Sequence, residues 1–582
     1  MPDSLTALLT ATPYSYNVMA AADITPVGGK FNEAGVRREA YNFYFQDTWK
    51  ATLHLTVNYG LRYELNTRIH EATKRTSLPI FTGPDGKTVP YWDRNAHQEV
   101  FINPQPPYDL DVNGWGPRLA LDYAVAKQTV LHAGASIATG LPNLWQDNFL
   151  TAGIPYVFAP SIYAQPNEPV TFHNAFVPLN LPTAYNVRGQ PIFATGRSED
   201  VPANTVFDYA RFQTDLNALA PGNVQLLNIS GIAKNFGNGY IGSWTAGVDH
   251  DFGDFKFNAS YVATAGIHLA RVYNPNSYGG ACQGFAPFTQ FDTPCHATGG
   301  FGPESLMTSA AHSTYHALQT SLTKNSARYG LGLQASYTYS KSLDDTSAVL
   351  GGLLGASGTI LQTGPQNPWD PAAEKGPSTF DVTHVLAASV IQVLPLERVH
   401  FLRPLGRTFT RGWQVLNITT LTTGSPFTVF SGIQQTGAGL GGADRPDLVS
   451  MPQASTSRQV RADYFGRGND NKSFFFVPIS TDEVTIPGGT GPHSGRFGTL
   501  GRNTFRGPAF HGFDFAVIKD TPFGHRGNGE LATIEFRAEF FNIFNVVNFG
   551  LPSNIVNGSG FGIISKTAGS SRQIQFSLKV IY

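Results

Sequence analysis

Residues 53–64 read LHLTVNYGLRYE, and this stretch decides the fold class. Its odd-numbered positions are apolar or aromatic, whereas its even-numbered positions are polar, charged or glycine. Because successive side chains of a β-strand point to opposite faces, the alternation predicts a strand with one apolar and one polar face. The stretch is about twice as long as an ordinary globular strand. Tilted as in a membrane barrel, it would cross roughly the 30 Å hydrocarbon core of a bilayer.

The same alternation recurs and predicts thirteen strands, over residues 38–47, 52–64, 117–124, 129–138, 241–251, 255–265, 314–324, 330–341, 379–394, 411–423, 512–519, 531–542 and 571–582. In the stretch LATIEFRAEFF, three charged residues follow one another on one strand face. Such a row cannot lie in a dry core without partners, but it can line a wet lumen. The predicted lumen-facing residues are Arg62, Glu64, Glu535, Arg537 and Glu539.

The composition agrees with strands that lie between lipid and a wet interior. Charged residues make up 14% and aromatic residues 12% of the 582 residues, while the mean hydropathy is only −0.15. Soluble proteins carry about 25% charged residues. No run of about 18 apolar residues predicts a transmembrane helix. A net charge of −1 gives no electrostatic basis for nucleic-acid binding.

The connections between the predicted strands alternate between short and very long. Tight turns such as FGD and AVAKQ contrast with long segments rich in Pro, Gly and Asn, the longest of which is Thr139 to Tyr240. Outer-membrane barrels have short periplasmic turns and long extracellular loops. The sequence therefore predicts an all-β fold: a partial, transmembrane, antiparallel up-and-down β-barrel, in contact with outer-membrane lipid of a Gram-negative bacterium.

Three further groups of residues carry predictions with open alternatives. Cys282 and Cys295, the only cysteines, are predicted to form a disulfide in a surface loop, the alternative being two free thiols. Aromatic residues of the longest loop could stack on a ligand or simply pack the loops; they are Trp145, Tyr156, Tyr163, Tyr185 and Phe193. The last strand, with Phe576 and the final Tyr582, is typical of the signal for the barrel-assembly machinery, although an ordinary terminal strand is the alternative.

Motifs for covalent chemistry fail in context. GNGYIG (237–242) is followed by a predicted strand and not by a helix, so it does not predict a phosphate-binding loop. DLDVNG (109–114) resembles the start of a calcium loop, but position twelve is Ala120. We therefore expect no enzyme activity, no catalytic residue, no cofactor and no metal.

Together the strings FYFQDTWKATLHLTVNYGLRYE, GPRLALDYAVAKQTVLHAG, YHALQTSLTKNSARYGLGLQASYTYSKSLDD and FRAEFFNIFNVVNFG resemble the barrel of the Oar-like TonB-dependent receptors, from about Tyr41 to Tyr582. The resemblance implies an outer-membrane receptor that takes up a ligand bound on its extracellular loops. It also implies a signal peptide, a carboxypeptidase-regulatory-like domain and a plug, through which TonB would act.

The chain departs from that pattern at its start. MPDSLTALLTATPYS has neither the basic nor the apolar region of a signal peptide, and no plug is recognisable. An odd number of predicted strands points the same way, because bacterial barrels have an even number. We therefore expect a fragment, with residues 1–37 a remnant of an extracellular loop and 38–582 the barrel. The alternative function is a structural or adhesive outer-membrane barrel without transport, and the ligand is unidentified.

Overall fold

The computed structural model describes the chain over residues 15–17, 35–89, 97–140, 148–151, 153–156, 161–163, 183–219, 229–273, 304–325, 330–347, 365–367, 370–432, 444–452, 464, 474–477, 497–525, 531–558 and 560–581. Within these ranges no helix is long and apolar enough to cross a membrane. Strands dominate, and most of them belong to one large sheet.

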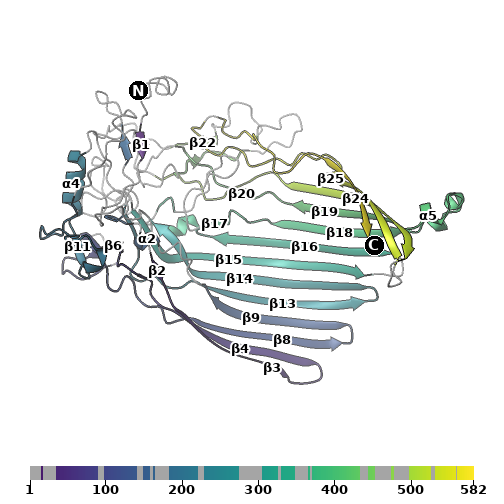
Figure 1. The fold of residues 1–582 in the computed structure, drawn as a ribbon, viewed down its shortest axis with the longest axis horizontal. Coiled ribbons are helices and arrows are strands. Elements are labelled where there is room, and N and C mark those ends of the chain that lie inside the picture. The colour runs from purple at the N-terminus through teal and green to yellow at the C-terminus, as the bar shows by residue number, and fades with distance from the viewer. Residues whose placement is uncertain are drawn as a thin grey trace.

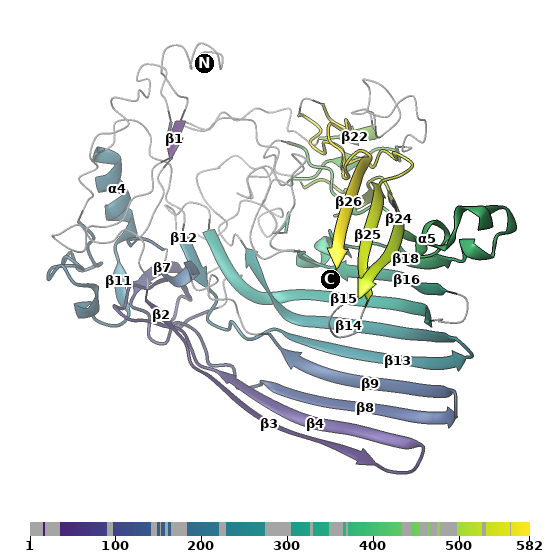
Figure 2. The same cartoon turned by 45° about the vertical axis from the view of Figure 1, so that its right-hand side comes forward.

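The large sheet is an antiparallel meander of thirteen long strands in chain order (Figure 1). They are β3 (Ala40–Lys50), β4 (Leu55–Asn66), β8 (Trp115–Ala126), β9 (Thr129–Thr139), β13 (Tyr240–Phe252), β14 (Phe255–Tyr273), β15 (Glu304–Asn325), β16 (Leu331–Asp344), β18 (His384–Leu394), β19 (Trp413–Thr422), β24 (Phe510–His525), β25 (Leu531–Phe541) and β26 (Gln573–Ile581). The sheet curves strongly but does not close, and β3 and β26 form its two edges (Figure 2).

The predicted all-β fold is confirmed, and a strand of the sheet lies at each predicted position. The largest differences in length concern β14, β15 and β24. For β14 and β15, residues beyond Gly266 and before Ser313 were predicted to be loop. Their pairing continues across a β-bulge between Gly266 and Leu269, where His268 has a φ of 55°. A bulge inserts one extra residue and reverses the alternation, which hides the continuation from a period-two pattern.

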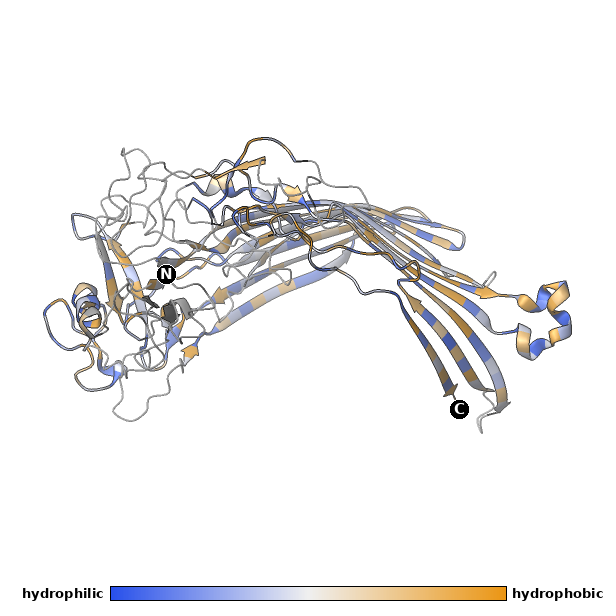
Figure 3. Ribbon diagram, turned by 90° about the horizontal axis from the view of Figure 1, so that it is seen from above, coloured by the Kyte–Doolittle hydropathy of each residue, from blue (hydrophilic) through white to orange (hydrophobic). Residues whose placement is uncertain are grey.

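The register separates two faces of the sheet. In β4 and β8 one face carries large apolar side chains that are exposed in the isolated chain; they include Leu61, Leu119, Leu121 and Tyr123. On β26 the corresponding residues Phe576 and Leu578 are 67% and 70% exposed. We call this the apolar face and the opposite one the polar face. Figure 3 shows the resulting bands of hydrophobic and hydrophilic residues along the strands. In a membrane barrel the apolar face contacts lipid and the polar face lines the lumen.

The two ends of the sheet differ. Tight turns join β3 to β4, β8 to β9 and β13 to β14 at one end, whereas the long loops lie at the other (Figure 1). One connection at the short-turn end is long: residues 395–412 join β18 to β19 through the 3-10 turns η5 (Leu396–Arg398) and η6 (His400–Leu405) and the short helix α5 (Arg407–Thr410). We call this segment the periplasmic helical segment.

The loop end has secondary structure of its own. A small sheet has the order β11 (Thr205–Phe207), β7 (His97–Ile102), β6 (Ser77–Thr82), and α4 (Tyr209–Leu219) follows β11 directly. Short pieces complete this layer: β1 (Ser15–Asn17), β2 (Val36–Arg37), β5 (His70–Glu71), α2 (Asn148–Thr151), β10 (Ser161–Tyr163), η2 (Ser198–Asp200), β12 (Ile229–Ile232), η4 (Pro371–Glu374), β17 (Gly376–Pro377), β20 (Pro426–Phe427), β21 (Asp447–Leu448), β22 (Phe475–Phe476) and β23 (Phe505–Arg506). Of residues 1–37, β1 pairs with β10 and β2 with β5.

Candidate functional site

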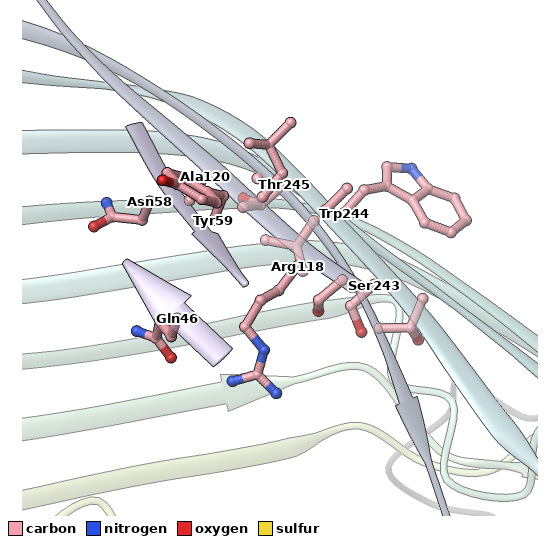
Figure 4. Close-up of a pocket in the computed structure, with 14 residues that line it drawn as sticks. Gln46, Asn58, Tyr59, Arg118, Ala120, Ser243, Trp244 and Thr245 are labelled. Carbon is pink, nitrogen blue, oxygen red and sulfur yellow. The ribbon is translucent and has the colours of Figure 1, made fainter. Parts of the chain in front are cut away.

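The polar face carries a row of hydrogen-bonding side chains that crosses neighbouring strands. The register places Arg118 of β8 opposite Ser136 of β9, then Ser243 of β13 and Thr264 of β14. These residues line a hollow of about 400 Å³ together with Gln46 and Asn58. In Figure 4 the side chains of Arg118, Gln46 and Ser243 extend on one side of the sheet, and Trp244 points away from them.

Gly60 makes room for this row. It lies opposite Arg118 on the polar face. A Cβ atom at this position would come within 2.8 Å of the Phe45 carbonyl oxygen and 3.3 Å of the Arg118 Cγ. Glycine therefore lets the arginine side chain lie close across β4, and the polar row depends on it.

The polar face of the first strands also holds linked charged groups. Arg62 donates from Nη2 to Asn42 Oδ1 at 3.2 Å and pairs with Glu64. Glu64 in turn accepts a hydrogen bond from the Thr139 hydroxyl. His132 Nδ1 lies 3.2 Å from a carboxylate oxygen of Asp249. The structure thus places two of the predicted lumen-facing residues in one network.

The other three predicted lumen-facing residues form a ladder near the far edge. Arg537 lies between Glu535 and Glu539, with N–O distances of 3.9 and 3.5 Å. Across the strand pair, Glu535 faces Lys579. The neighbouring row holds Phe536, whose ring stacks on Phe576 at 6.4 Å between centroids. The charged ladder therefore occupies the polar face and the phenylalanines the apolar face.

One part of the polar face is not polar. Ile391 of β18 lies in the same cross-strand row as Leu416 and Glu539. Ile391, Val393 and Ile418 are 43%, 41% and 44% exposed, although they lie on the lumen side. We call these three residues the lumen patch. The sequence HVLAASVIQVL of β18 is apolar on both faces, which was the available signal for it.

The structure places the predicted loop aromatics differently from one another. Tyr156 is fully buried, its ring 5.6 Å from that of Phe193, and burial raises the pKa of its hydroxyl. Its ring is therefore packed inside the loop layer and not open to a ligand. Tyr185 lies under the Arg211 guanidinium, 3.5 Å from the ring centroid. Trp145 lies outside the described residues, and Tyr163 is described only as the last residue of β10.

Buried ion pairs, which we did not predict, hold the loop end together. Arg445 makes two hydrogen bonds to Glu374, at 2.7 and 2.8 Å, and both side chains are at most 3% exposed. Arg502 pairs with Asp344 and also donates to the Glu374 carbonyl oxygen at 2.9 Å. The partners lie 71 and 158 residues apart in sequence, so alternation and spacing could not reveal them.

Two adjoining hollows lie in the loop layer. The first, of about 440 Å³, is lined mainly by apolar side chains, including Leu78 and Ile80 of β6, Phe101 of β7 and Leu306 of β15. The second, of about 450 Å³, is lined by several polar side chains, among them Asp111, Asn113, His268 and Ser309, and by Leu110 and Phe236. Asp109 and Asn235 line both hollows. The chain thus holds two hollows side by side, the second with more hydrogen-bonding side chains, and each is large enough for part of a small molecule.

Some predictions concern residues that the structure does not describe. Cys282, Cys295 and Tyr582 are outside the described residues, so the disulfide and the final aromatic of the assembly signal stay predictions. In the described part of the chain, no group of three or more His, Cys, Asp or Glu side chains could hold a metal ion.

The sequence matches the family model described as "Outer membrane beta barrel domain" over residues 26–575. A search of curated proteins found no match. Solved structures that resemble the chain include the ferripyoverdine receptor of the Pseudomonas aeruginosa outer membrane, with 8% identity and a TM-score of 0.39 over 94% of this chain and 39% of that one. The ferric citrate transporter FecA has 11% identity and a TM-score of 0.36, over 95% of this chain and 47% of that one. The ferric yersiniabactin uptake receptor FyuA of Yersinia pestis has 9% identity and a TM-score of 0.38, over 94% of this chain and 46% of that one.

The chain spans less than half the length of each of these three structures. The family match covers nearly all of the thirteen-stranded sheet. Its description fits the two faces, the short turns and the long loops of that sheet. The chain therefore belongs to the outer membrane beta-barrel domain family, and its location is the outer membrane of a Gram-negative bacterium.

Proposed function

We propose that the chain forms barrel strands of an Oar-like TonB-dependent receptor, which binds a ligand at the cell surface and takes it up through the lumen. In this proposal the chain binds the ligand and guides it through the lumen, and it carries out no covalent chemistry. A plug inside the lumen would receive the pull from TonB, while the barrel would hold the plug and present the loops.

The lumen patch is the observation that carries the proposal. In an open water-filled pore, Ile391, Val393 and Ile418 would expose apolar surface to water without benefit. An exposed apolar patch rimmed by polar groups is typical of a surface that another protein part covers. A plug packed against β18 and β19 would cover it, while the hydrogen-bonding row around Arg118 would face its polar side.

The loop hollows are the proposed ligand contact. Residues Asn204, Ala233, Lys234 and Asn235 of the longest loop line them, next to residues from β6 and β7. An apolar part of a ligand would occupy the first hollow, and hydrogen-bonding groups would meet Asp109, Asn235 and His268 in the second.

The genomic DNA upstream of the Met1 codon tests this proposal. We expect an open frame that encodes a plug, either continuous with this chain or in an adjacent gene. A stop codon close upstream, with no plug-encoding gene beside it, would contradict uptake by this chain. It would favour the structural or adhesive barrel instead.

A further inference from the structure

The periplasmic helical segment, residues 395–412, combines exposed apolar side chains with exposed arginines. Phe401, Leu405 and Phe409 are 78%, 58% and 69% exposed. The segment contains four arginines and one glutamate, so its net charge is +3 with His400 neutral. Among the described residues, no ion pair joins a carboxylate to any of the four arginines, which are Arg398, Arg403, Arg407 and Arg411.

The segment is a folded unit and not a loose turn. The turns η5 and η6 and the helix α5 all contact one another. Gly406, with a φ of 79°, ends η6 and precedes α5. The Trp413 indole nitrogen donates to the Phe409 carbonyl oxygen at 2.6 Å, and the Asp520 amide donates to the Gly412 carbonyl oxygen at 2.9 Å. These bonds tie the segment to the start of β19 and to Asp520 within β24.

The position of the segment determines which part of the membrane it can contact. Leu394 and Trp413 face each other at the last pair of β18 and β19, on the apolar face. Lys519, 6.0 Å from the Trp413 ring, shares this end of the apolar face. Figure 1 and Figure 3 show the segment projecting from the short-turn end of the sheet. The chain therefore leaves the lipid-facing surface at the periplasmic boundary of the bilayer and enters this basic, aromatic unit at once.

We propose that residues 395–412 are a binding site for the head groups of anionic phospholipids in the periplasmic leaflet of the outer membrane. Phe401, Leu405 and Phe409 enter the boundary between head groups and acyl chains, as apolar side chains of interfacial helices do. The arginines bind the phosphates, since a guanidinium forms paired hydrogen bonds with phosphate oxygens. The β8–β9 turn at the same end lacks this combination, since it offers only Lys127 next to Gln128.

Lipids are the occupant favoured by continuity and by charge. The exposed apolar side chains continue a surface that already faces lipid, and basic residues beside a membrane are attracted to an anionic leaflet. A soluble polyanion would account for the arginines but not for the phenylalanines. The inference depends on the membrane location of the barrel and is independent of whether the barrel transports anything.

Hydrogen–deuterium exchange of the whole chain, folded into vesicles, tests the proposal. Vesicles of phosphatidylcholine alone are compared with vesicles of phosphatidylcholine mixed with phosphatidylglycerol. We expect phosphatidylglycerol to slow amide exchange in 395–412 by about tenfold or more, because each basic residue near an anionic surface contributes substantially. Added salt should reverse the effect. The β8–β9 turn serves as the internal control and should not change.

Two quadruple variants distinguish the effect of the positive charge from that of the guanidinium group. Replacing all four arginines by glutamine should abolish the response to phosphatidylglycerol, whereas replacing them by lysine should retain most of it. In the variant Phe401→Ser/Phe409→Ser, protection should fall in both kinds of vesicle. Equal exchange of the wild-type segment in the two lipids would overturn the proposal, and this comparison needs no variant to fold. Protection by phosphatidylglycerol that persists in the glutamine variant would also overturn it.

Discussion

At the residue scale, the buried pair of Arg445 and Glu374 is the clearest support for an ordered loop end. Breaking a buried pair by removing one charge costs about 3–5 kcal/mol, because the other charge stays behind without compensation. Glu374→Gln should therefore loosen the segments around 365–383 and 444–452. Hydrogen exchange or limited proteolysis of these segments measures the change. The double variant Glu374→Leu/Arg445→Met is the control and should cost less; equal damage from both would contradict the role of the pair.

Glu71 gives a pH dependence at the same scale. Burial tends to raise the pKa of its carboxyl, but hydrogen bonds from the backbone of Arg75, Gly35 and Thr73 outweigh burial and lower the pKa. A carboxyl with a lowered folded-state pKa stabilises the fold above its unfolded pKa and loses this contribution as pH falls. We expect the pairing of β2 with β5 to weaken as pH falls through and below the ordinary value of 4.5. The protection factors of the amides of residues 35–37, in which the intrinsic pH dependence of exchange is divided out, should fall there, and Glu71→Gln should remove this change. Protection factors that do not vary with pH in the wild type would contradict this.

At the scale of elements, the two faces of each strand predict opposite tolerance to charge. Leu121 lies on the apolar face of β8, where its cross-strand partner is Val57 of β4. The next residue of β4, Asn58, lies on the polar face. An arginine facing lipid near the bilayer midplane costs about 2–4 kcal/mol. Leu121→Arg should therefore lower the free energy of unfolding in vesicles by up to this amount, and Asn58→Arg should have a much smaller effect. Equal effects would contradict the assignment of the faces.

Most of the large sheet could be predicted from the sequence, because strands with two unlike faces leave a period-two signal. The expected positions of β4 and β25 agree with the structure within a few residues. Prediction was weaker where that signal ends. The bulge at His268 hid the extension of β14, and the periplasmic helical segment gave no alternation to read. The apolar residues on both faces of β18 were a signal for the lumen patch that we did not use. The loop hollows could not be predicted, since their lining residues are far apart in the sequence.

At the scale of the whole molecule, the chain is a curved sheet with a loop layer at one end and a basic aromatic unit at the other. The sheet stays open between β3 and β26, and these two strands run in the same direction, as the first and last of thirteen antiparallel strands must. In the hydrocarbon core of a bilayer, the unpaired backbone N–H and C=O groups of an edge strand need hydrogen-bond partners from protein. In the assembled receptor that we propose, β3 and β26 therefore both pair with further strands in the membrane.

Cysteine labelling on intact cells tests the central claim, the transmembrane orientation of the sheet. In the background Cys282→Ser/Cys295→Ser, single cysteines replace Arg188 in the loop layer or Lys127 in the β8–β9 turn, both of which are exposed. We expect a membrane-impermeant maleimide to label Arg188→Cys on intact cells, and to label Lys127→Cys only after the outer membrane is permeabilised. Labelling of both at equal rates on intact cells, or of neither before permeabilisation, would contradict a barrel that spans the outer membrane with its long loops outside.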